Sequence, residues 1–520
     1  MKVYMLKRIL FSIFSLVVVV MIVMLLVYSL IDRKVIFQND DIWNKKFLND
    51  RTAYEYSQYQ KFGYMVTQEY GAFLKSLYAD VEDYQNDPQF KADRNAIKNP
   101  ETYTENESVQ KFIATYKSQG YNITYLDPIK YSDGSLKPGG AAALYAIKEK
   151  SVFERMWEYA TGILSFETTN DVKDPNLTDR YIRIEKDPYG LFAIVGSGTT
   201  HKYLLYFDSR FPFIHQNFVH LNLGVSFTRY RGDEISDVIV RPQGDLKYKT
   251  ITFPTGWEES TAINMHSLKY NPNGGGEFEA QRFTDNYSTY TYNKTDLSRF
   301  GNSAVIGVIS TIIAYMLGLP LGILMARKKD KFVDKLGNMY IIFIMAVPSL
   351  AYIFMFAAIG TMVFKLPYTF ANAKVKALAY VLPTISLALP AVGGLMKWMR
   401  RYMVDQMNSD YVKFARSQGL SEREIYSTHI SRNAMIYIVH GIPGTLLGSI
   451  TGAIITESIY SVPGIGNLLT EAISKHDNAV IVAVTVFYTS ISIISLILGD
   501  LLLIKYDPRI SLSSSKGGGR

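Results

Sequence analysis

The chain contains no cysteine, so disulfide bonds, thiol nucleophiles and thiolate metal sites are all excluded. It also lacks the His-Glu-x-x-His and Gly-x-Ser-x-Gly motifs of common hydrolases. Its seven histidines are scattered, and His215 and His220 are five residues apart, which places them on different faces of a helix. We therefore expect no catalytic residue, no metal site and no cofactor-binding site in this chain.

Phosphate-binding loops are missing as well. The glycine-rich turns at residues 137–140 and 271–276 are not followed by the Lys-Ser/Thr pair of a nucleotide-binding loop. Any ATP and Mg²⁺ that the system uses would therefore be bound by a partner protein. The net charge of +8 does not require nucleic acid, because much of the basic excess sits at the edges of apolar segments. Anionic lipid and a soluble subunit are the partners that this distribution favours.

Long hydrophobic runs are present once near the N-terminus and repeatedly after residue 300. Crossing a bilayer takes roughly 20 apolar helical residues. Six segments approach this length, at residues 9–31, 303–325, 340–364, 378–399, 436–455 and 479–504. The first is too long for a signal peptide and no small-x-small cleavage site follows it, so we expect a retained anchor. The predicted fold class is an α-helical polytopic membrane protein with six transmembrane helices.

Basic residues set the predicted orientation of these helices. The most basic short connections are residues 327–335 and 397–401, which the positive-inside rule places in the cytoplasm. Lys2, Lys7 and Arg8 before the first span agree with this placement, and an even number of spans puts both termini on the cytoplasmic side. We therefore expect a multi-pass protein of a bacterial cell membrane.

The region between the first two spans would then form a large extracellular domain. Aromatic residues embedded in polar sequence from 41 to 80 favour helices. Alternation of apolar and polar residues at 181–185, 237–241 and 247–253 favours strands, so an α+β domain is expected. The predicted division of the chain is as follows: residues 1–31 for the cytoplasmic tip and first span, 32–301 for the extracellular domain, 302–508 for the core of five further spans, and 509–520 for a flexible tail.

A polar helix-turn-helix pattern at residues 410–425 interrupts the apolar segments. Gly419 can adopt the left-handed conformation that ends one helix. Ser421 can cap the next helix, and Glu424 three residues later completes a capping box. The pattern predicts a compact elbow in a cytoplasmic loop at about 400–435, where force from an ATPase could enter the membrane. A solvated amphipathic loop is the alternative interpretation.

Residues 300–512 resemble the membrane subunit of a binding-protein-dependent ABC importer of the oligopeptide/dipeptide class. Residues 410–422 match the cytoplasmic coupling motif of that class, residues 457–466 resemble its outer-loop signature, and residues 507–509 resemble its C-terminal ending. Residues 218–226 are similar to its external motif before the second span.

The long insertions before the second span resemble those of Gram-positive oligopeptide permeases of the Ami type, first membrane subunit. The resemblance implies the type I permease fold and alternating access driven by partners. The implied partners are a second, nonidentical permease subunit, two cytoplasmic ATPases, a lipid-anchored peptide-binding protein and the peptide itself. Lys413 and Phe414 depart from the broader permease pattern, which has an acidic residue and alanine at these positions.

The resemblance also implies roles for individual residues. In the elbow, Gly419 and Ser421 would shape the turn. Apolar docking to the ATPase is expected from Tyr411, Phe414, Ala415 and Leu420, and charged contacts from Arg416, Glu422, Arg423 and Arg432. In the outer loop, a gate is expected around Glu457, Pro463, Gly464 and Gly466.

Two features of the spans carry further predictions. Gly444, Gly448 and Gly452 recur every four residues along one stripe, which permits close approach of another helix. Glu457 and Asp500 are carboxylates near the ends of spans, for which we expect structural pairing rather than substrate contact.

Two other functions stay open. A membrane-anchored receptor or adhesion protein would explain the large outer region but not the elbow. An importer of another cargo, such as a nickel chelate, a sugar or haem, would share the architecture, because specificity usually resides in the separate binding protein.

Overall fold

The computed structural model describes residues 2–30, most of 33–260, 291–450 and 454–506. The undescribed positions between residues 33 and 260 are single residues and short stretches, most of them after residue 166. The predictions made for Gly452, for the turn at residues 271–276 and for the tail at residues 509–520 lie outside the described residues.

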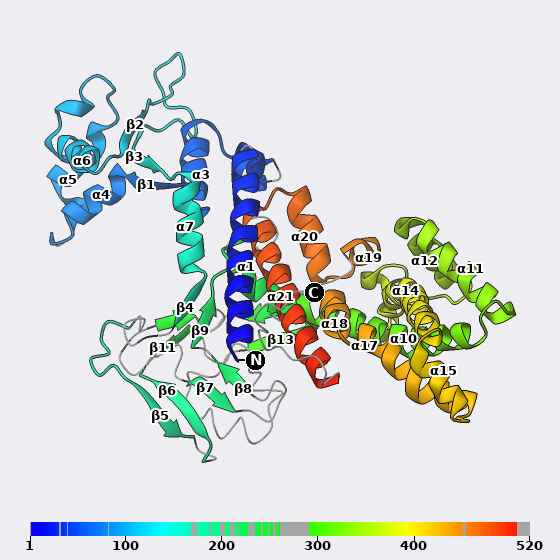
Figure 1. Cartoon of the computed structure of the whole chain (residues 1–520). Helices are drawn as coiled ribbons and strands as arrows, with labels where there is room; N and C mark the ends of the chain where they lie inside the picture. Colours follow the sequence, from blue (N-terminus) through cyan, green and yellow to red (C-terminus); the bar gives the residue numbers. More distant parts are fainter. Residues whose placement is uncertain are drawn as a thin grey trace, which may run out of the picture.

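Within this part of the chain, five helical segments are long and apolar enough to cross a membrane. They are Leu6–Ser29, Arg299–Arg327, Lys376–Met407, Ile442–Ile459 and Asn478–Lys505. The corresponding elements in Figure 1 are α1 (Lys2–Leu30), α10 (Arg299–Arg327), α13 (Lys376–Ala379) with α14 (Val381–Met407), α18 (Ile442–Ile450) with α19 (Ile454–Ile459), and α21 (Asn478–Tyr506). These segments match five of the six predicted spans.

The sixth predicted span, residues 340–364, is a bent pair of helices in the structure. Its residues fall in α11 (Phe332–Ala346) and α12 (Ser349–Met362), which meet at an angle of 111°. Val347 and Pro348 both have extended backbone angles at the break. Proline disfavours the helical conformation of the residue before it and has no N–H to donate, so the helix ends there. The two helices together give a sixth candidate span only if the bent pair is counted as one.

Helix α10 is at the centre of the membrane core and packs against α14, α18 and α11. A side chain added at Gly307 would overlap the carbonyl oxygen of Ser449 on α18. Gly318 and Gly322 face α14 in the same way, because an added Cβ would lie 2.8 Å from Leu395 Cβ and 2.9 Å from the Met396 carbonyl oxygen, respectively. Small residues on α10 thus let the helices approach closely.

The region after α1 begins with a compact α+β unit at residues 33–149. Its elements are α2 (Asp41–Lys45), α3 (Leu48–Lys61), β1 (Met65–Glu69), α4 (Tyr70–Leu77), α5 (Pro88–Ala96), α6 (Glu107–Ser118), β2 (Asn122–Leu126) and β3 (Ala143–Glu149). The strands form an antiparallel sheet in the order β1-β3-β2. Tyr70, Leu74, Val109 and Phe112 pack against Leu144 and Ala146 of β3 in the core. Figure 1 places this unit beyond the C-terminal end of α1.

A second, β-rich part follows α7 (Val152–Gly162), which packs along α1. Its elements are β4 (Leu164–Phe166) paired with β9 (Val219–Leu221), a sheet of β5 (Ile182–Lys186), β6 (Phe192–Gly196), β7 (Tyr203–Phe207) and β8 (Ile214–Gln216), the helix α8 (Ile235–Val240), β10 (Gln243–Lys247) paired with β13 (Thr291–Asp296), and β11 (Thr250–Thr252) paired with β12 (Glu258–Ser260). Figure 1 shows the β5–β8 sheet near the N-terminal end of α1. Residues 33–260 thus contain an α+β unit followed by a β-rich part, and an extracellular location for both stays a prediction.

The strand predicted at residues 237–241 was wrong, because residues 235–240 form α8. Ile235, Val238 and Ile239 are buried at helical spacing among residues of α1, α20 (Ile465–Ser474) and α21. The neighbouring helices therefore decide the conformation of this apolar stretch, whose sequence fits either period. The strands predicted at residues 181–185 and 247–253 correspond to β5 and, in the described residues, to the end of β10 and to β11.

Candidate functional site

The predicted elbow is present and has the expected turn. Helix α15 (Asp410–Ser417) ends before Gly419, whose φ of +82° is in the left-handed region. Ser421 caps α16 (Glu422–Glu424): its Oγ accepts from the Glu424 backbone N–H at 3.3 Å, and the Ser421 N–H donates to Glu424 Oε2 at 3.0 Å. The left-handed glycine and the capping box are therefore both confirmed. The chain continues through a π-helical segment (Ile425–Ile430) into α17 (Ser431–Val439).

One face of the elbow is buried against the ends of two core helices. Val412 and Ala415 pack into a cluster with Ala326 of α10 and with Met399 and Met403 of α14. The other buried members of this cluster, which we call the elbow cluster, are Ile425, Ile430, Ala434 and Ile438. Ala415 is only 5% exposed, so its predicted direct contact with a partner is corrected: it attaches the elbow to α10 and α14.

The opposite face of the elbow is exposed and mixes apolar with charged side chains. Phe414 is 64% exposed and Leu420 is 38% exposed, so both are available for apolar docking. Arg416 Nε donates to Glu422 Oε1 at 2.7 Å across the turn. This bond from the Arg416 guanidinium holds the pKa of Glu422 below its ordinary value.

The other predicted elbow residues take different positions. Arg423 is exposed, whereas Tyr411 is partly buried and donates from its hydroxyl to Gln406 Oε1 at 2.8 Å. Lys413 pairs with Asp410 at 2.9 Å on the exposed surface. Arg432, on α17, is also exposed. The exposed face of the elbow is therefore formed mainly by Phe414, Leu420 and the charged residues around the turn, and its contact with a partner stays a prediction.

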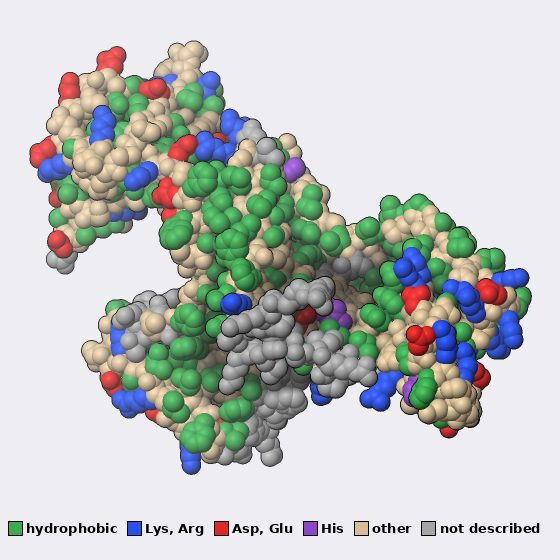
Figure 2. Space-filling model, viewed as in Figure 1, with side chains coloured by type: hydrophobic (Ala, Val, Ile, Leu, Met, Phe, Trp, Pro, Cys, Tyr) green, Lys and Arg blue, Asp and Glu red, His purple; other side chains and the backbone are tan. Residues whose placement is uncertain are grey.

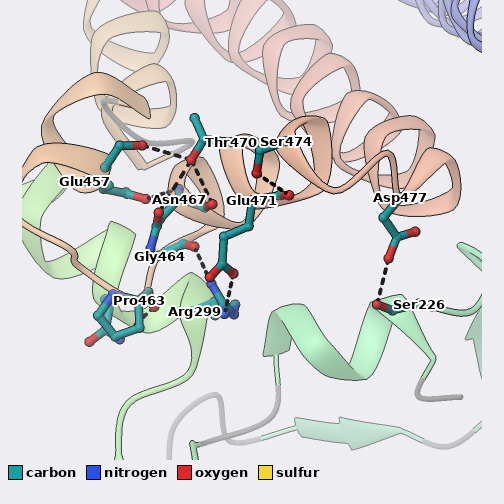
Figure 3. A network of polar contacts seen from close by, with 12 residues as sticks. Ser226, Arg299, Glu457, Pro463, Gly464, Asn467, Thr470, Glu471, Ser474 and Asp477 are labelled. Atoms are coloured by element: carbon teal, nitrogen blue, oxygen red, sulfur yellow. Dashed lines mark hydrogen bonds and ion pairs between the residues drawn. The ribbon is translucent and has the colours of Figure 1, made fainter. Parts of the chain in front are cut away.

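The outer-loop signature folds around the buried carboxylate of Glu457 (Figure 3). Glu457 Oε1 accepts from Ser303 Oγ at 2.7 Å, and Oε2 accepts from the Asn467 backbone N–H at 3.1 Å. Ser303 Oγ accepts in turn from the Ile465 N–H at 3.0 Å. A side chain at Gly464 would overlap Glu457 Oε2, so glycine is needed there to let the loop close over the carboxylate.

A second set of contacts attaches the same loop to α10 and to the start of α14. The Arg299 guanidinium, which is 1% exposed, donates to the Gly464 carbonyl at 3.2 Å and lies 3.5 Å from Glu471 Oε2. Asn302 Nδ2 donates to the Pro463 carbonyl at 3.0 Å, and Tyr380 OH donates to Asn302 Oδ1 at 2.6 Å.

Gly466 also lies close to this network. An added Cβ would be 2.8 Å from Ile454 Cα and 3.0 Å from Glu457 Oε2. The four predicted outer-loop residues thus come together, and they are joined by Arg299, Asn302 and Ser303, which sequence reasoning missed. Their spacing was the available signal, since three polar residues at i, i+3 and i+4 share one face at the start of an apolar helix.

Asp500, the other carboxylate singled out in the spans, is also paired. Arg8 Nη1 of α1 lies 2.6 Å from Asp500 Oδ2 on α21, and His440 Nδ1 lies 3.9 Å from Oδ1. Both carboxylates therefore have structural partners, as expected. The Arg8 pair joins the start of the first span to the end of the last.

In the described residues, the predicted glycine stripe on α18 is represented by Gly444 and Gly448. An added Cβ at Gly444 or Gly448 would meet no described atom within 4 Å. The close contact with α18 is instead made by Gly307 of α10, opposite Ser449. A contact of the stripe with a second subunit stays a prediction.

The two parts of residues 33–260, named the outer region here after their predicted location, also contact the core, at the turn between α20 and α21. Ser226 Oγ donates to Asp477 Oδ2 at 3.0 Å (Figure 3). Asn478 Nδ2 donates to the Tyr64 hydroxyl at 3.2 Å. The Arg155 guanidinium of α7 stacks between the rings of Tyr28 and Tyr64, 3.7 Å from each ring centroid. These contacts link residues far apart in sequence. Among the described residues, no cluster of three His, Cys, Asp or Glu could hold a metal ion.

Comparison with known proteins places this geometry in a family. The sequence model of the family described as "Binding-protein-dependent transport system inner membrane component" matches residues 318–512. The oligopeptide transport system permease protein AmiC of Streptococcus pneumoniae is 34% identical over 100% of both chains. The dipeptide transport system permease protein DppB of Bacillus subtilis is 33% identical over 41% of this chain and 68% of its own. The chain therefore belongs to the binding-protein-dependent transport system inner membrane components, the permease subunits of ABC importers.

Proposed function

We propose that this chain is one permease subunit of an ATP-driven oligopeptide importer and forms half of its translocation pathway. The observation that carries the proposal is full-length similarity to AmiC, which extends through the outer region as well as the core. The elbow supports it, because a folded cytoplasmic helix pair with an exposed Phe414 is what a coupling contact requires.

The core offers a direct mechanical route for this function. Helices α10 and α14 both reach the elbow cluster, through Ala326 and through Met399 with Met403. At its opposite end α10 carries Arg299 and Asn302 of the outer-loop network, and Tyr380 precedes α14 there. The helix rises about 40 Å from Arg299 to Ala326, at 1.5 Å per residue. ATP-driven closure of the ATPases would move the elbow, tilt both helices and shift the outer loop toward an open state.

The proposed assembly needs partners that this chain does not supply. A second, nonidentical permease subunit would complete the pathway as a heterodimer, and two cytoplasmic ATPases would bind ATP and Mg²⁺ and dock on the two elbows. A lipid-anchored binding protein would deliver the peptide. This chain would bind no cofactor of its own.

The proposed topology has six spans, with α11 and α12 counted together, and both termini in the cytoplasm. The basic residues of the 327–335 and 397–401 connections support this orientation. The domain division then runs from a first span within residues 1–31, through an extracellular region at 32–301, to a core at 302–508 and a tail at 509–520. The receptor alternative leaves the elbow without a role, and other cargoes are distinguished by the transport experiment below.

The test is ATP-dependent uptake of labelled peptides by proteoliposomes that contain this chain, its sister permease, the ATPases and the binding protein. In the Gly419→Pro variant, φ is fixed near −65°, so the turn with φ of +82° cannot form. Gly419→Asn is the matched control, since asparagine tolerates the left-handed region. We expect uptake to be lost in the proline variant and largely retained in the asparagine variant.

Three results would contradict the proposal. They are uptake that is equal in the two variants, failure of the wild-type chain to associate with ATPases, and uptake of a nickel chelate or haem in place of peptides.

A further inference from the structure

A cavity of about 280 Å³ lies at the junction of α1, α7 and the end of α3. Its apolar wall includes Met24 and Tyr28 from the last two turns of α1, together with Phe62. Its polar lining includes Lys61 and the α7 residues Arg155 and Tyr159. None of the contacts proposed above for transport uses this cavity.

The charge in this cavity is positive and partly uncompensated. Arg155 is only 6% exposed, and within the described part of the chain no carboxylate forms an ion pair with it. Glu158 also lines the cavity, but Lys150 Nζ lies 2.6 Å from both of its carboxylate oxygens. Buried charges are normally paired, so the guanidinium with Lys61 beside it favours an anionic ligand.

A buried polar atom without a partner points to the same conclusion. The Tyr159 hydroxyl is shielded from solvent and makes no hydrogen bond within the described structure. Tyr159 lines the cavity, and an unsatisfied buried hydroxyl costs free energy, which an acceptor that reaches it would recover. Phosphate oxygens are acceptors for all three groups, namely the guanidinium, the ammonium and the hydroxyl.

The surface around the cavity is suited to lipid. Phe153 and Trp157, one turn apart on α7, are 72% and 69% exposed. Figure 2 shows hydrophobic side chains gathered over the region where Figure 1 places α1 and α7. Tryptophan and a cationic side chain beside an apolar surface are typical of the membrane interface. The cavity is lined by other residues of α7, among them Arg155 and Tyr159, and it lies one to two turns from the end of a candidate membrane span.

We propose that this cavity binds the phosphate of an anionic phospholipid, with Arg155, Lys61 and Tyr159 around the headgroup and an acyl chain along Met24 and Tyr28. In the orientation proposed above, the lipid belongs to the outer leaflet. Arg155 also stacks on Tyr64, and the Tyr64 hydroxyl accepts a hydrogen bond from Asn478 in the α20–α21 turn. A lipid bound to Arg155 would therefore hold α7 and the α+β unit against this turn. A soluble phosphate presents the same chemistry, and the lipid is favoured by the apolar wall and the exposed Phe153 and Trp157.

The test is native mass spectrometry of the full-length chain in detergent, with phosphatidylglycerol, phosphatidylcholine and inorganic phosphate added separately. We expect preferential retention of one phosphatidylglycerol. Lys61→Gln should weaken retention about fivefold, as for one basic residue at a membrane surface, and Tyr159→Phe should weaken it as well. Lys117→Gln, an exposed lysine on α6, is the matched control and should change nothing. Arg155→Gln should abolish retention. If the Arg155→Gln variant does not fold, the Lys61→Gln variant still tests the proposal.

The outcomes separate the possible ligands. Equal retention of the two lipids, or unchanged phosphatidylglycerol retention in Lys61→Gln and Tyr159→Phe, would overturn the proposal. Binding of inorganic phosphate without phosphatidylglycerol would identify a soluble-anion site instead. Displacement of the lipid by a peptide carboxylate would indicate a cargo site. The measurement needs no ATPase and no uptake, so its failure is distinguishable from failure of the importer proposal.

Discussion

At the scale of single residues, the conformation of the outer loop depends on one buried carboxylate and on the glycines that leave room for it. Glu457 is 1% exposed and accepts from Ser303 and from the backbone of Asn467. Gly464 has ordinary backbone angles, with φ of −106° and ψ of −176°. Any residue could adopt this conformation, so glycine is required by the lack of space and not by the backbone.

A residue-scale prediction follows for Gly464→Ala. The added methyl group would collide with Glu457 Oε2 and force the carboxylate away from its donors. Overpacking of this kind costs roughly 1–3 kcal/mol, so we expect a lower thermal unfolding midpoint for the purified chain and weaker peptide uptake. The control is Gly394→Ala on α14, where an added Cβ meets nothing within 4 Å. An unchanged midpoint in Gly464→Ala would show that the loop does not close over Glu457 as described.

At the scale of elements, the elbow has one face that holds it to the core and another that is free to bind. Val412 is fully buried beside Ala415, whereas Phe414 between them is exposed. The two roles therefore alternate along a single short helix, which makes them separable by mutation.

The element-scale prediction compares Phe414→Ser with Val412→Ser. The first removes exposed apolar surface, so the chain should keep its unfolding midpoint but lose ATPase during co-purification. The second places a hydroxyl in the elbow cluster and leaves a cavity, which costs roughly 2–5 kcal/mol. We expect the second variant to unfold at a lower temperature. If Phe414→Ser retains the ATPase as well as wild type does, this face of α15 is not the docking surface.

Local features of the elbow could be predicted because caps and left-handed turns depend on a few neighbouring residues. Gly419, Ser421 and Glu424 are examples. The burial of Ala415 could not be predicted in this way, because it depends on Ala326, Met399 and other residues that are distant in sequence and that the fold places next to it.

The same contrast holds for the spans. Their apolar length predicted six spans, of which five correspond to candidate spans of the structure, but the length of a hydropathy run does not reveal the bend at Pro348 in the sixth. Spacing alone also suggested a packing stripe on α18, whereas the close contact depends on Gly307 of another helix. Helix α8 was missed because α1, α20 and α21 stabilise one of two conformations that its residues allow.

At the scale of the whole molecule, the outer region is attached to the core next to the outer-loop network. Ser226 contacts Asp477 and Tyr64 contacts Asn478, and both partners are 1% exposed. Helix α20, which precedes this turn, carries Glu471 near Arg299. A binding protein that docks on the outer region could therefore influence the loop through these contacts.

The prediction at this scale concerns Ser226→Ala and Tyr64→Phe, which delete only the hydroxyls. Each leaves a buried polar group without one partner, at a cost of roughly 1–3 kcal/mol. We expect faster hydrogen exchange at the α20–α21 turn and reduced binding-protein-dependent uptake, with the ATPases still bound because the elbow is untouched. Tyr131→Phe, at a tyrosine that is 50% exposed in the same outer unit, is the control for loss of a hydroxyl. Normal uptake in both variants despite faster exchange would mean that these contacts stabilise the outer region without transmitting binding to the core.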